Sequence, residues 1–439
     1  MKFYNRVAEL ERLQQIQQLS LENAQFTVLT GRRRVGKTQL LLKATENQPT
    51  LYFFVSRKSE QFLCQDFAEE INKKLELPLF GTAQNFSSIF NYLMQLSTTR
   101  SFNLIIDEFQ EFLNINPSVY SDMQHDWDIL KEKSKMNLLV CGSVHSLMHN
   151  IFEDYKAPLF GRATNIMRIK PFQVSVLKTI LSEHNPSFTP EDLLALYTFS
   201  GGVAKYVQLL IDNKALTLSK MLDFIIKEDS SFIADGKNML IEEFGKEYAV
   251  YFTILSAISK GDNTRSKIEA VVGKEVGGYL TRMENDYGLI SKSLPLYSKS
   301  ATKNIRYMLL DNYLTFWFRF IYKYNHLLEI NQFGELRRIV ERDYATFSGK
   351  ILEKYFREQY IEKGGITRIG GYWDKTGENE IDLIVVNENE KSAQFVEVKR
   401  NEKHIRYNEL KEKAANMMAK TGQLKGFNIE YRGLSMENM

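Results

Sequence analysis

The chain has 439 residues, of which 44% are hydrophobic and 25% are charged, and its formal net charge is +3. This length is more than one hydrophobic core supports, so we expect two to four domains. The near-neutral charge neither requires nor excludes nucleic acid as a partner. The two cysteines, Cys64 and Cys141, exclude a disulfide framework and a cysteine-rich zinc site, and they favour a reducing compartment.

We expect a cytoplasmic protein that does not enter a membrane. The opening segment MKFYNRVAELERL is charged throughout, unlike a secretory signal peptide. The most apolar later segment, YLTFWFRFIY at 313–322, is too short to span a bilayer and contains Arg319.

Strands and helices are expected to alternate over residues 1–171. An amphipathic helix at 5–19 precedes apolar strands at 24–31, 50–56, 102–112 and 136–143, with helical segments between them. Apolar runs of this kind are typical of parallel strands that are covered on both faces. The sequence therefore predicts a three-layer α/β domain with a parallel sheet, followed by helices over 172–245.

The segment GRRRVGKT at 31–38 matches the pattern G-x-x-x-x-G-K-T between a predicted strand and a predicted helix, which is the context of a phosphate-binding loop. Gly31 and Gly36 allow the backbone to wrap phosphates closely, Lys37 can reach the β- and γ-phosphates, and Thr38 can hold Mg²⁺. The segment predicts a site for ATP or GTP. Its further expected nucleotide contacts are Arg32, Arg33, Arg34, Val35 and Gln39.

Two later strand ends carry polar residues that suit the same site. LIIDE at 104–108 ends in Asp107, which can hold Mg²⁺ through water, and in Glu108, which can orient or deprotonate the attacking water. LLVCGS ends in Ser143, whose hydroxyl can sense the γ-phosphate. The alternatives are a solvated acidic pair and a turn-forming serine.

Arg162, in the segment LFGRAT, is a candidate arginine finger. Such a residue stabilises negative charge in the transition state and can act on its own nucleotide or on that of a second copy of the chain. The alternative is an ordinary surface arginine.

The segments FYNRVAELERL, GRRRVGKT, LIIDE, CGS, LFGRAT and SGGVAKYV resemble the archaeal-type ATPase family of AAA+ and STAND-like P-loop proteins. The resemblance covers roughly residues 1–230. It implies that the protein binds and hydrolyses ATP. It also implies that Arg6 and Glu9 lie near the adenine pocket and that the helices of 172–245 form a lid.

Residues 246–345 are expected to form a winged-helix and helical linker domain. Helices over the first part are followed by SLPLY and NIRYML, which can pair as the wing. Such domains read DNA through a recognition helix and basic wing residues, here Arg282, Lys292, Lys299, Lys303 and Arg306. Glu284 and Asp286 lie on the same helix, so we favour an intramolecular or protein contact over DNA reading.

The segment EIDLIVVNENEKSAQFVEVKR at 380–400 is expected to form two strands joined by a polar loop. The pairing places Asp382 opposite Glu397, and Lys399 shares a face with Glu397 because side chains alternate along a strand. Two carboxylates can hold a second ion, Mg²⁺ or Mn²⁺, and a nearby lysine can stabilise negative charge on phosphate. The alternative is a salt-bridged hairpin in which Lys399 neutralises Glu397.

This D…E-x-K arrangement resembles the PD-(D/E)XK nucleases. RIGGYWDKTGENEIDLIVV and FVEVKR also resemble the DUF234 domain that follows archaeal-type ATPases. The resemblance implies a restriction-endonuclease-like α/β domain over 346–439. It also implies that Glu353, on the preceding helix, adds a metal-binding acid.

The predicted domains are thus 1–171, 172–245, 246–345 and 346–439. We expect an ATPase whose nucleotide cycle gates a winged helix and a nuclease-like domain that acts on nucleic acid, with ATP and DNA as partners. The alternative is an ATP-dependent regulatory switch with an inactive C-terminal interaction domain and a protein partner or a second copy of the chain. Metal-dependent DNA nicking, with and without ATP, discriminates between the two.

Overall fold

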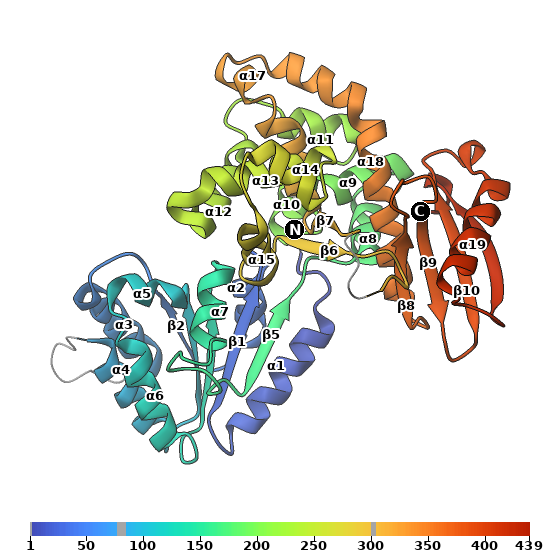
Figure 1. Ribbon diagram of the computed structural model, residues 1–439. Helices are drawn as coiled ribbons and strands as arrows, with labels where there is room; N and C mark the ends of the chain where they lie inside the picture. Colours follow the sequence, from blue (N-terminus) through green and yellow to red (C-terminus); the bar gives the residue numbers. More distant parts are fainter. Residues whose placement is uncertain (1, 77–84, 300–303) are drawn as a thin grey trace. The chain divides into compact units, whose positions relative to one another are not determined.

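A computed structural model of the protein describes residues 2–76, 85–299 and 304–439 (Figure 1). Internal contacts divide the chain into two compact units. One is Asn5–Pro171, and the other joins the segment ending at Tyr4 to Phe172–Met439. The three boundaries between the four predicted domains stay predictions, and the one between 345 and 346 falls inside a single helix, α18 (Phe333–Lys363).

The described residues of the Asn5–Pro171 unit form a five-stranded sheet with the order β2-β3-β4-β1-β5. All its neighbouring strands are parallel. Its strands are β1 (Gln25–Gly31), β2 (Thr50–Phe54), β3 (Phe102–Asp107), β4 (Met136–Cys141) and β5 (Asn165–Ile169). Because β4 lies between β1 and β3, the loops that follow these three strands leave the same edge of the sheet side by side.

Helices cover both faces of this sheet, so the predicted three-layer P-loop fold is confirmed (Figure 1). The helices are α1 (Val7–Ser20), α2 (Lys37–Ala44), α3 (Glu60–Leu75), α4 (Phe86–Leu96), α5 (Phe112–Ile115), α6 (Val119–Leu130) and α7 (His145–Phe152), with the short turn η1 (Phe109–Glu111). Side chains alternate along β3: Ile105 joins the core under α1 and α2, whereas Leu104 and Ile106 join the core under α3, α4, α6 and α7.

The second unit begins with the helices predicted for the lid. These are α8 (Val174–His184), α9 (Pro190–Ser200), α10 (Ala204–Asp212), α11 (Leu218–Ile225) and α12 (Ser231–Phe244). Local signals define α9 well. Thr189 and Asp192 form a capping box, Pro190 occupies the first turn, and Gly201 ends the helix with a left-handed φ of 56°.

Three helices and an antiparallel hairpin follow, in the element order predicted for the winged-helix segment. They are α13 (Tyr248–Lys260), α14 (Arg265–Val272), α15 (Gly277–Asn285), β6 (Ile290–Ser293) and β7 (Arg306–Leu309), and the short turn η2 (Gly245–Glu247) precedes them. The prediction that SLPLY forms a wing strand is wrong, because the strand ends at Ser293. Pro295 has no N–H to donate to a ladder, and Leu296 N donates instead to Gly371 O at 2.8 Å.

The remaining helical elements connect this hairpin to the C-terminal sheet. They are α16 (Asn312–Phe316), the π-helical turn η3 (Trp317–Tyr322), α17 (Asn325–Glu329) and α18. Within the described residues, no helix is both long and apolar enough to cross a bilayer. The cytoplasmic location stays a prediction.

A separate mixed sheet with the order β11-β10-β9-β8 forms the C-terminal part of the chain. Its strands β8, β9 and β10 are antiparallel, and β11 pairs with β10 in parallel. The elements are β8 (Arg368–Tyr372), β9 (Ile381–Asn387), β10 (Ser392–Val398), η4 (Glu402–His404), α19 (Tyr407–Thr421), β11 (Asn428–Leu434) and η5 (Met436–Asn438).

The two faces of this sheet belong to different cores. Ile384 and Phe395 pack with α19, whereas Leu383 and Val396 join the large core that α8–α16 and α18 build. The C-terminal sheet is therefore integrated with the lid helices through one continuous apolar core.

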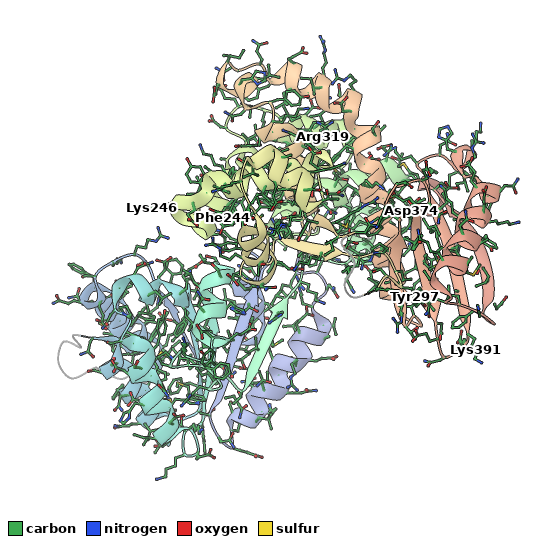
Figure 2. All side chains as sticks on the ribbon, viewed as in Figure 1. Phe244, Lys246, Tyr297, Arg319, Asp374 and Lys391 are labelled. Carbon is green, nitrogen blue, oxygen red and sulfur yellow. The ribbon has the colours of Figure 1, made fainter. Side chains whose placement is uncertain are left out.

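The hairpin also contacts the edge of the C-terminal sheet. Tyr297 packs against this sheet (Figure 2). Asn304 Nδ2 donates to Trp373 O at 3.1 Å, and the Arg306 guanidinium lies 4.4 Å from the centre of the Trp373 ring. These contacts cover the free edge of β8, which would otherwise offer unpaired backbone groups to another chain.

Candidate functional site

The loop between β1 and α2 has the backbone that a phosphate-binding loop requires. Gly31 has a φ of 139°, and a Cβ there would lie 2.4 Å from Ile169 O. Arg34 and Gly36 also have positive φ angles, of 67° and 99°. Only glycine fits at position 31. The positive φ angles at these three positions turn backbone N–H groups toward one side of the loop, where an anion can bind.

Lys37 lies at the centre of this loop. Its Nζ donates to Gly31 O at 2.8 Å and to Arg32 O at 3.0 Å, and the residue is only 7% exposed. The amine is therefore held inside the ring of backbone that would surround a phosphate. Of the other predicted contacts, Val35 is buried, Arg32, Arg33 and Arg34 are half-buried, and Gln39 is exposed.

Thr38 and Asp107 are brought together from two elements far apart in the sequence. Thr38 Oγ1 donates to Asp107 Oδ2 at 2.7 Å. A hydroxyl beside a carboxylate at the end of a P-loop is the oxygen donor set that Mg²⁺ prefers, so these residues fit the predicted ion.

Two residues that the sequence analysis missed also bond Asp107. Tyr52 on β2 donates to Oδ2 at 2.9 Å, and the Cys141 thiol on β4 lies 3.0 Å from Oδ1. Burial, reinforced by the charge of Asp107, raises the pKa of both Tyr52 and Cys141. Both groups therefore stay protonated at neutral pH and act as donors to the carboxylate.

Glu108 and Ser143 also meet, at the ends of neighbouring strands. Ser143 Oγ donates to Glu108 Oε2 at 2.7 Å, and Gln110 Nε2 donates to the same oxygen at 2.5 Å. Gln110 was not predicted, and Gly142 makes room for it, because a Cβ at that position would lie 2.1 Å from Gln110 Oε1. The proposed base and the proposed sensor thus share one hydrogen-bond network.

Arg6 lies beside the phosphate-binding loop. The residue is buried, and its guanidinium donates to Lys170 O at 2.6 Å and to Val35 O at 3.4 Å. Glu9 Oε1 accepts a further bond at 2.9 Å. Arg6 is thus close to the loop backbone, and its contact with adenine stays a prediction.

Arg162 lies at the opposite end of the sheet from this loop. Its guanidinium pairs with Asp128 Oδ2 at 3.1 Å, and Thr164 N, two residues later, donates to Phe26 O near the start of β1. The seven residues of β1 span roughly 20 Å. An arginine side chain cannot bridge that length, so the geometry does not support a finger that acts on its own nucleotide. Action on a second copy stays a prediction.

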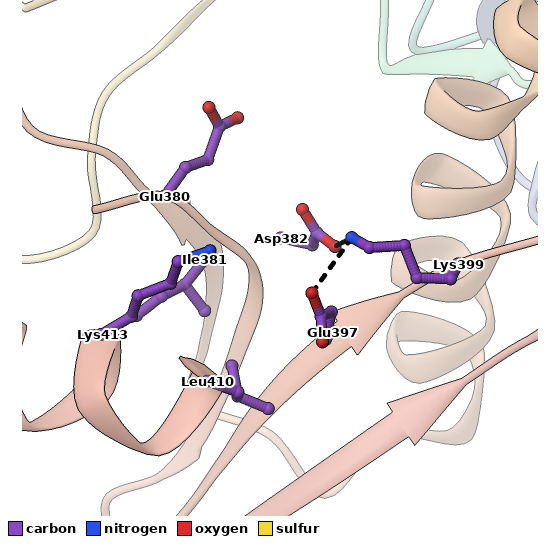
Figure 3. Close-up of a pocket in the computed structure, with 7 residues that line it drawn as sticks. All are labelled: Glu380, Ile381, Asp382, Glu397, Lys399, Leu410 and Lys413. Atoms are coloured by element: carbon purple, nitrogen blue, oxygen red, sulfur yellow. Dashed lines mark hydrogen bonds and ion pairs between the residues drawn. The ribbon is translucent and has the colours of Figure 1, made fainter. Parts of the chain in front are cut away.

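A second polar cluster lies in the C-terminal sheet (Figure 3). The β9–β10 register, continued by one residue, places Asp382 opposite Glu397. Lys399 Nζ lies 3.5 Å from Asp382 Oδ2 and 3.2 Å from Glu397 Oε1. The cluster borders a pocket of about 210 Å³, which Glu380, Ile381, Leu410 and Lys413 also line.

Glu353 is paired with Lys350 on its own helix at 3.0 Å, and Lys350 lies 3.7 Å from Glu380. Burial, together with the nearby charge of Asp382, raises the pKa of Glu353 to about 7, although Lys350 opposes the shift. Among the described residues, no three or more His, Cys, Asp or Glu side chains are arranged to hold a metal. The predicted second ion therefore finds no support in the geometry.

Three of the five candidate DNA-contacting cations are paired within the chain. The pairs are Arg282 with Glu247 at 3.4 Å, Lys292 with Glu284 at 2.6 Å, and Arg306 with Glu380 at 2.8 Å. Lys303 lies outside the described residues. These contacts favour the intramolecular role of the hairpin, and DNA reading stays a prediction.

Comparisons with known proteins agree with these features. A model of ATPase domains found predominantly in Archaea matches residues 3–210. The DUF234 model, which describes archaeal and bacterial proteins of unknown function, matches residues 317–416. The uncharacterized protein MJECL04 of Methanocaldococcus jannaschii is 31% identical over 404 residues, covering 90% of this chain and 87% of that protein. The predicted resemblance to both families is confirmed.

The fold is also similar to a solved structure, the Walker-type ATPase paby2304 of Pyrococcus abyssi. The TM-score is 0.54 at 20% identity, and the likeness covers 72% of this chain and 96% of the other. At this identity the likeness shows a shared fold.

Proposed function

The chain belongs to a family of ATPases found predominantly in Archaea and carries a C-terminal DUF234 domain, and from this premise we propose that it hydrolyses ATP with Mg²⁺ to control that domain. One observation carries the proposal: Thr38 donates to Asp107 at 2.7 Å next to the enclosed amine of Lys37. A cation for phosphate and an oxygen pair for Mg²⁺ are thereby adjacent.

Each residue has a distinct role in this proposal. Lys37 and the loop N–H groups bind the phosphates. Thr38 and Asp107 would hold Mg²⁺, which would neutralise phosphate charge. Glu108 accepts the proton of the attacking water, and Ser143 orients Glu108 through their 2.7 Å bond.

The proposal is tested by phosphate release from ATP with the full-length protein. We expect turnover with Mg²⁺ and a loss of turnover when EDTA removes the metal. ATP binding that is never followed by phosphate release, with Mg²⁺ present, would show a binding protein instead of an ATPase.

The contacts within the second unit support control of the C-terminal domain by the lid. Arg400, the neighbour of Lys399, pairs with Glu191 of α9 and donates to Ser348 Oγ at 2.5 Å. Glu362 of α18 accepts from the N–H groups of Val174 and Ser175, which start α8. A displacement of the lid would therefore carry the C-terminal pocket with it, because packed cores move as units.

For the C-terminal domain we propose action on nucleic acid through Asp382, Glu397 and Lys399. Lys413 points into the same pocket from α19 (Figure 3) and supplies a further positive charge. Positive side chains beside two acids suit a phosphodiester.

The second candidate is an inactive interaction domain inside an ATP-dependent switch. Lys399 bonds both Asp382 and Glu397, which is the salt-bridged arrangement expected when the charges serve structure alone. A partner would then be a protein or a second copy of the chain. The absence of a three-residue metal group among the described residues favours this candidate.

Glu397→Ala distinguishes the two candidates. If the pocket is catalytic, the full-length protein nicks plasmid DNA with Mn²⁺, and the variant loses this activity while it keeps its ATPase rate. The expected loss is at least about 100-fold, because Glu397 would be one of the two acids that hold the ion. A matched control is Glu430→Ala on the neighbouring strand β11, which should cut normally. Wild-type protein that Mn²⁺ neither activates nor stabilises against heat would identify the inactive domain.

Arg162→Ala tests a role between two copies of the chain. If Arg162 acts on the nucleotide of a neighbour, wild-type turnover per molecule rises with protein concentration. The variant should lower this rise by roughly 1000-fold or more, with little change in ATP affinity. Turnover that does not depend on concentration, and that the variant leaves intact, would leave Arg162 as a surface ion pair with Asp128.

A further inference from the structure

The carboxylate of Asp107 is surrounded by donors on both oxygens. Thr38 and Tyr52 donate to Oδ2, at 2.7 and 2.9 Å. The Cys141 thiol and Glu108 N donate to Oδ1, at 3.0 and 2.9 Å. Asp107 itself is only 7% exposed, so these hydrogen bonds, and not bulk water, set the orientation of its buried carboxylate.

Tyr52 differs from the other three donors in its origin. Thr38, Glu108 and Cys141 belong to the loop and strands that build the nucleotide site, whereas Tyr52 comes from β2 at the edge of the sheet. The register pairs Tyr52 with Ile105, two residues before Asp107 on the same face. Its ring packs in the core under α1 and α2, and its hydroxyl reaches along the strand to the carboxylate.

The two donors on Oδ2 would respond differently to a bound metal. The Thr38 hydroxyl would also be a ligand of Mg²⁺, so its bond to Asp107 would have to adjust when the ion binds. Tyr52 has no such second task, so its bond to Oδ2 remains. The χ2 angle of an aspartate has a broad range, so its carboxylate can rotate when no fixed donor holds it.

We propose that Tyr52 is a positioning residue of the nucleotide site, whose hydroxyl holds Asp107 in the orientation that receives ATP-bound Mg²⁺. The inference rests on the proposed ATPase function and extends it to a residue outside the P-loop and the LIIDE segment. Tyr52 touches neither ATP nor the reacting water in this role, and it acts through Asp107.

Tyr52→Phe tests the inference, because it removes the hydroxyl and keeps the ring in its core. ATP affinity is measured by titration calorimetry with EDTA and then with increasing Mg²⁺. With EDTA, we expect the variant to bind ATP with the same affinity as wild type. With Mg²⁺, we expect the metal concentration that gives half of the full increase in ATP affinity to be about tenfold higher, because one hydrogen bond to a charged group is lost. The Mg²⁺ dependence of phosphate release should shift by the same factor.

Tyr92→Phe is the matched control, since Tyr92 on α4 packs in the core on the other face of the sheet. It should match wild type in both titrations. Tyr52→Phe with an unchanged Mg²⁺ dependence would overturn the inference, and so would an equal loss of affinity with EDTA, which would show that Tyr52 supports the whole loop. Lack of turnover by the wild-type protein would contradict the proposed function. The present inference is judged separately, by how the ATP affinity of Tyr52→Phe differs from that of wild type with and without Mg²⁺.

Discussion

Lys37→Ala is expected to abolish ATP binding at ordinary concentrations. The wild-type amine is enclosed by Gly31 O and Arg32 O, so it meets a bound phosphate without first being ordered. Charge-assisted hydrogen bonds to phosphate contribute about 1.5–3 kcal/mol each, and losing the only lysine of the loop should weaken binding at least about 100-fold. Titration calorimetry with ATP and Mg²⁺ measures the change.

Lys43→Ala serves as the matched control on the same helix. Lys43 is exposed and pairs with Glu46 at 2.5 Å, away from the loop. It should bind ATP as wild type does, and both variants should retain the melting temperature of the metal-free protein to within a few degrees. Unchanged ATP affinity in Lys37→Ala would contradict the P-loop assignment itself.

The nucleotide site shows which parts of a site a sequence predicts. Lys37, Thr38 and the loop glycines follow each other along the chain, so a local pattern identifies them. Asp107 was predictable because an acid at the end of an apolar strand is unusual. Tyr52 was not, because its contact depends on the register between β2 and β3, and a half-buried tyrosine in a strand is ordinary.

The C-terminal pocket shows the same division. Asp382 and Glu397 could be paired from the hairpin alone, since side chains alternate and the loop is short. The pairing of Arg306 with Glu380 depends on how the hairpin docks on β8, across more than 70 residues of sequence. No local pattern carries that information, so the sequence made Arg306 a candidate DNA contact, although an intramolecular or protein contact was favoured for this domain.

Arg162 shows a second limit of reasoning from sequence. Its segment LFGRAT resembles a family motif, and a motif match gives no position in space. In the structure Gly161 and Arg162 precede β5, at the end of the sheet where parallel strands begin. Ligands of parallel α/β sheets bind at the carboxyl ends of the strands, so the topology decides against a finger in the same molecule.

Glu108→Gln is expected to retain ATP binding and to lose hydrolysis. Glu108 Oε2 accepts bonds from Ser143 Oγ at 2.7 Å and Gln110 Nε2 at 2.5 Å, and the oxygen of a glutamine can accept both. The variant therefore keeps the local structure and removes only the capacity to take a proton. General-base catalysis contributes about 100- to 10,000-fold, so phosphate release should fall by that factor while calorimetric ATP affinity changes less than about threefold.

The same substitution at Glu111 separates proton acceptance from charge. Glu111 lies three residues away, and its carboxylate pairs with Arg57 at 3.0 Å. Glu111→Gln removes one negative charge from the same segment, so it reproduces the electrostatic change without touching the proposed base. If Glu111→Gln keeps full turnover and Glu108→Gln loses it, the loss is due to the missing proton acceptor at position 108. Equal losses would attribute both to charge, and wild-type turnover in Glu108→Gln would exclude Glu108 as the proton acceptor.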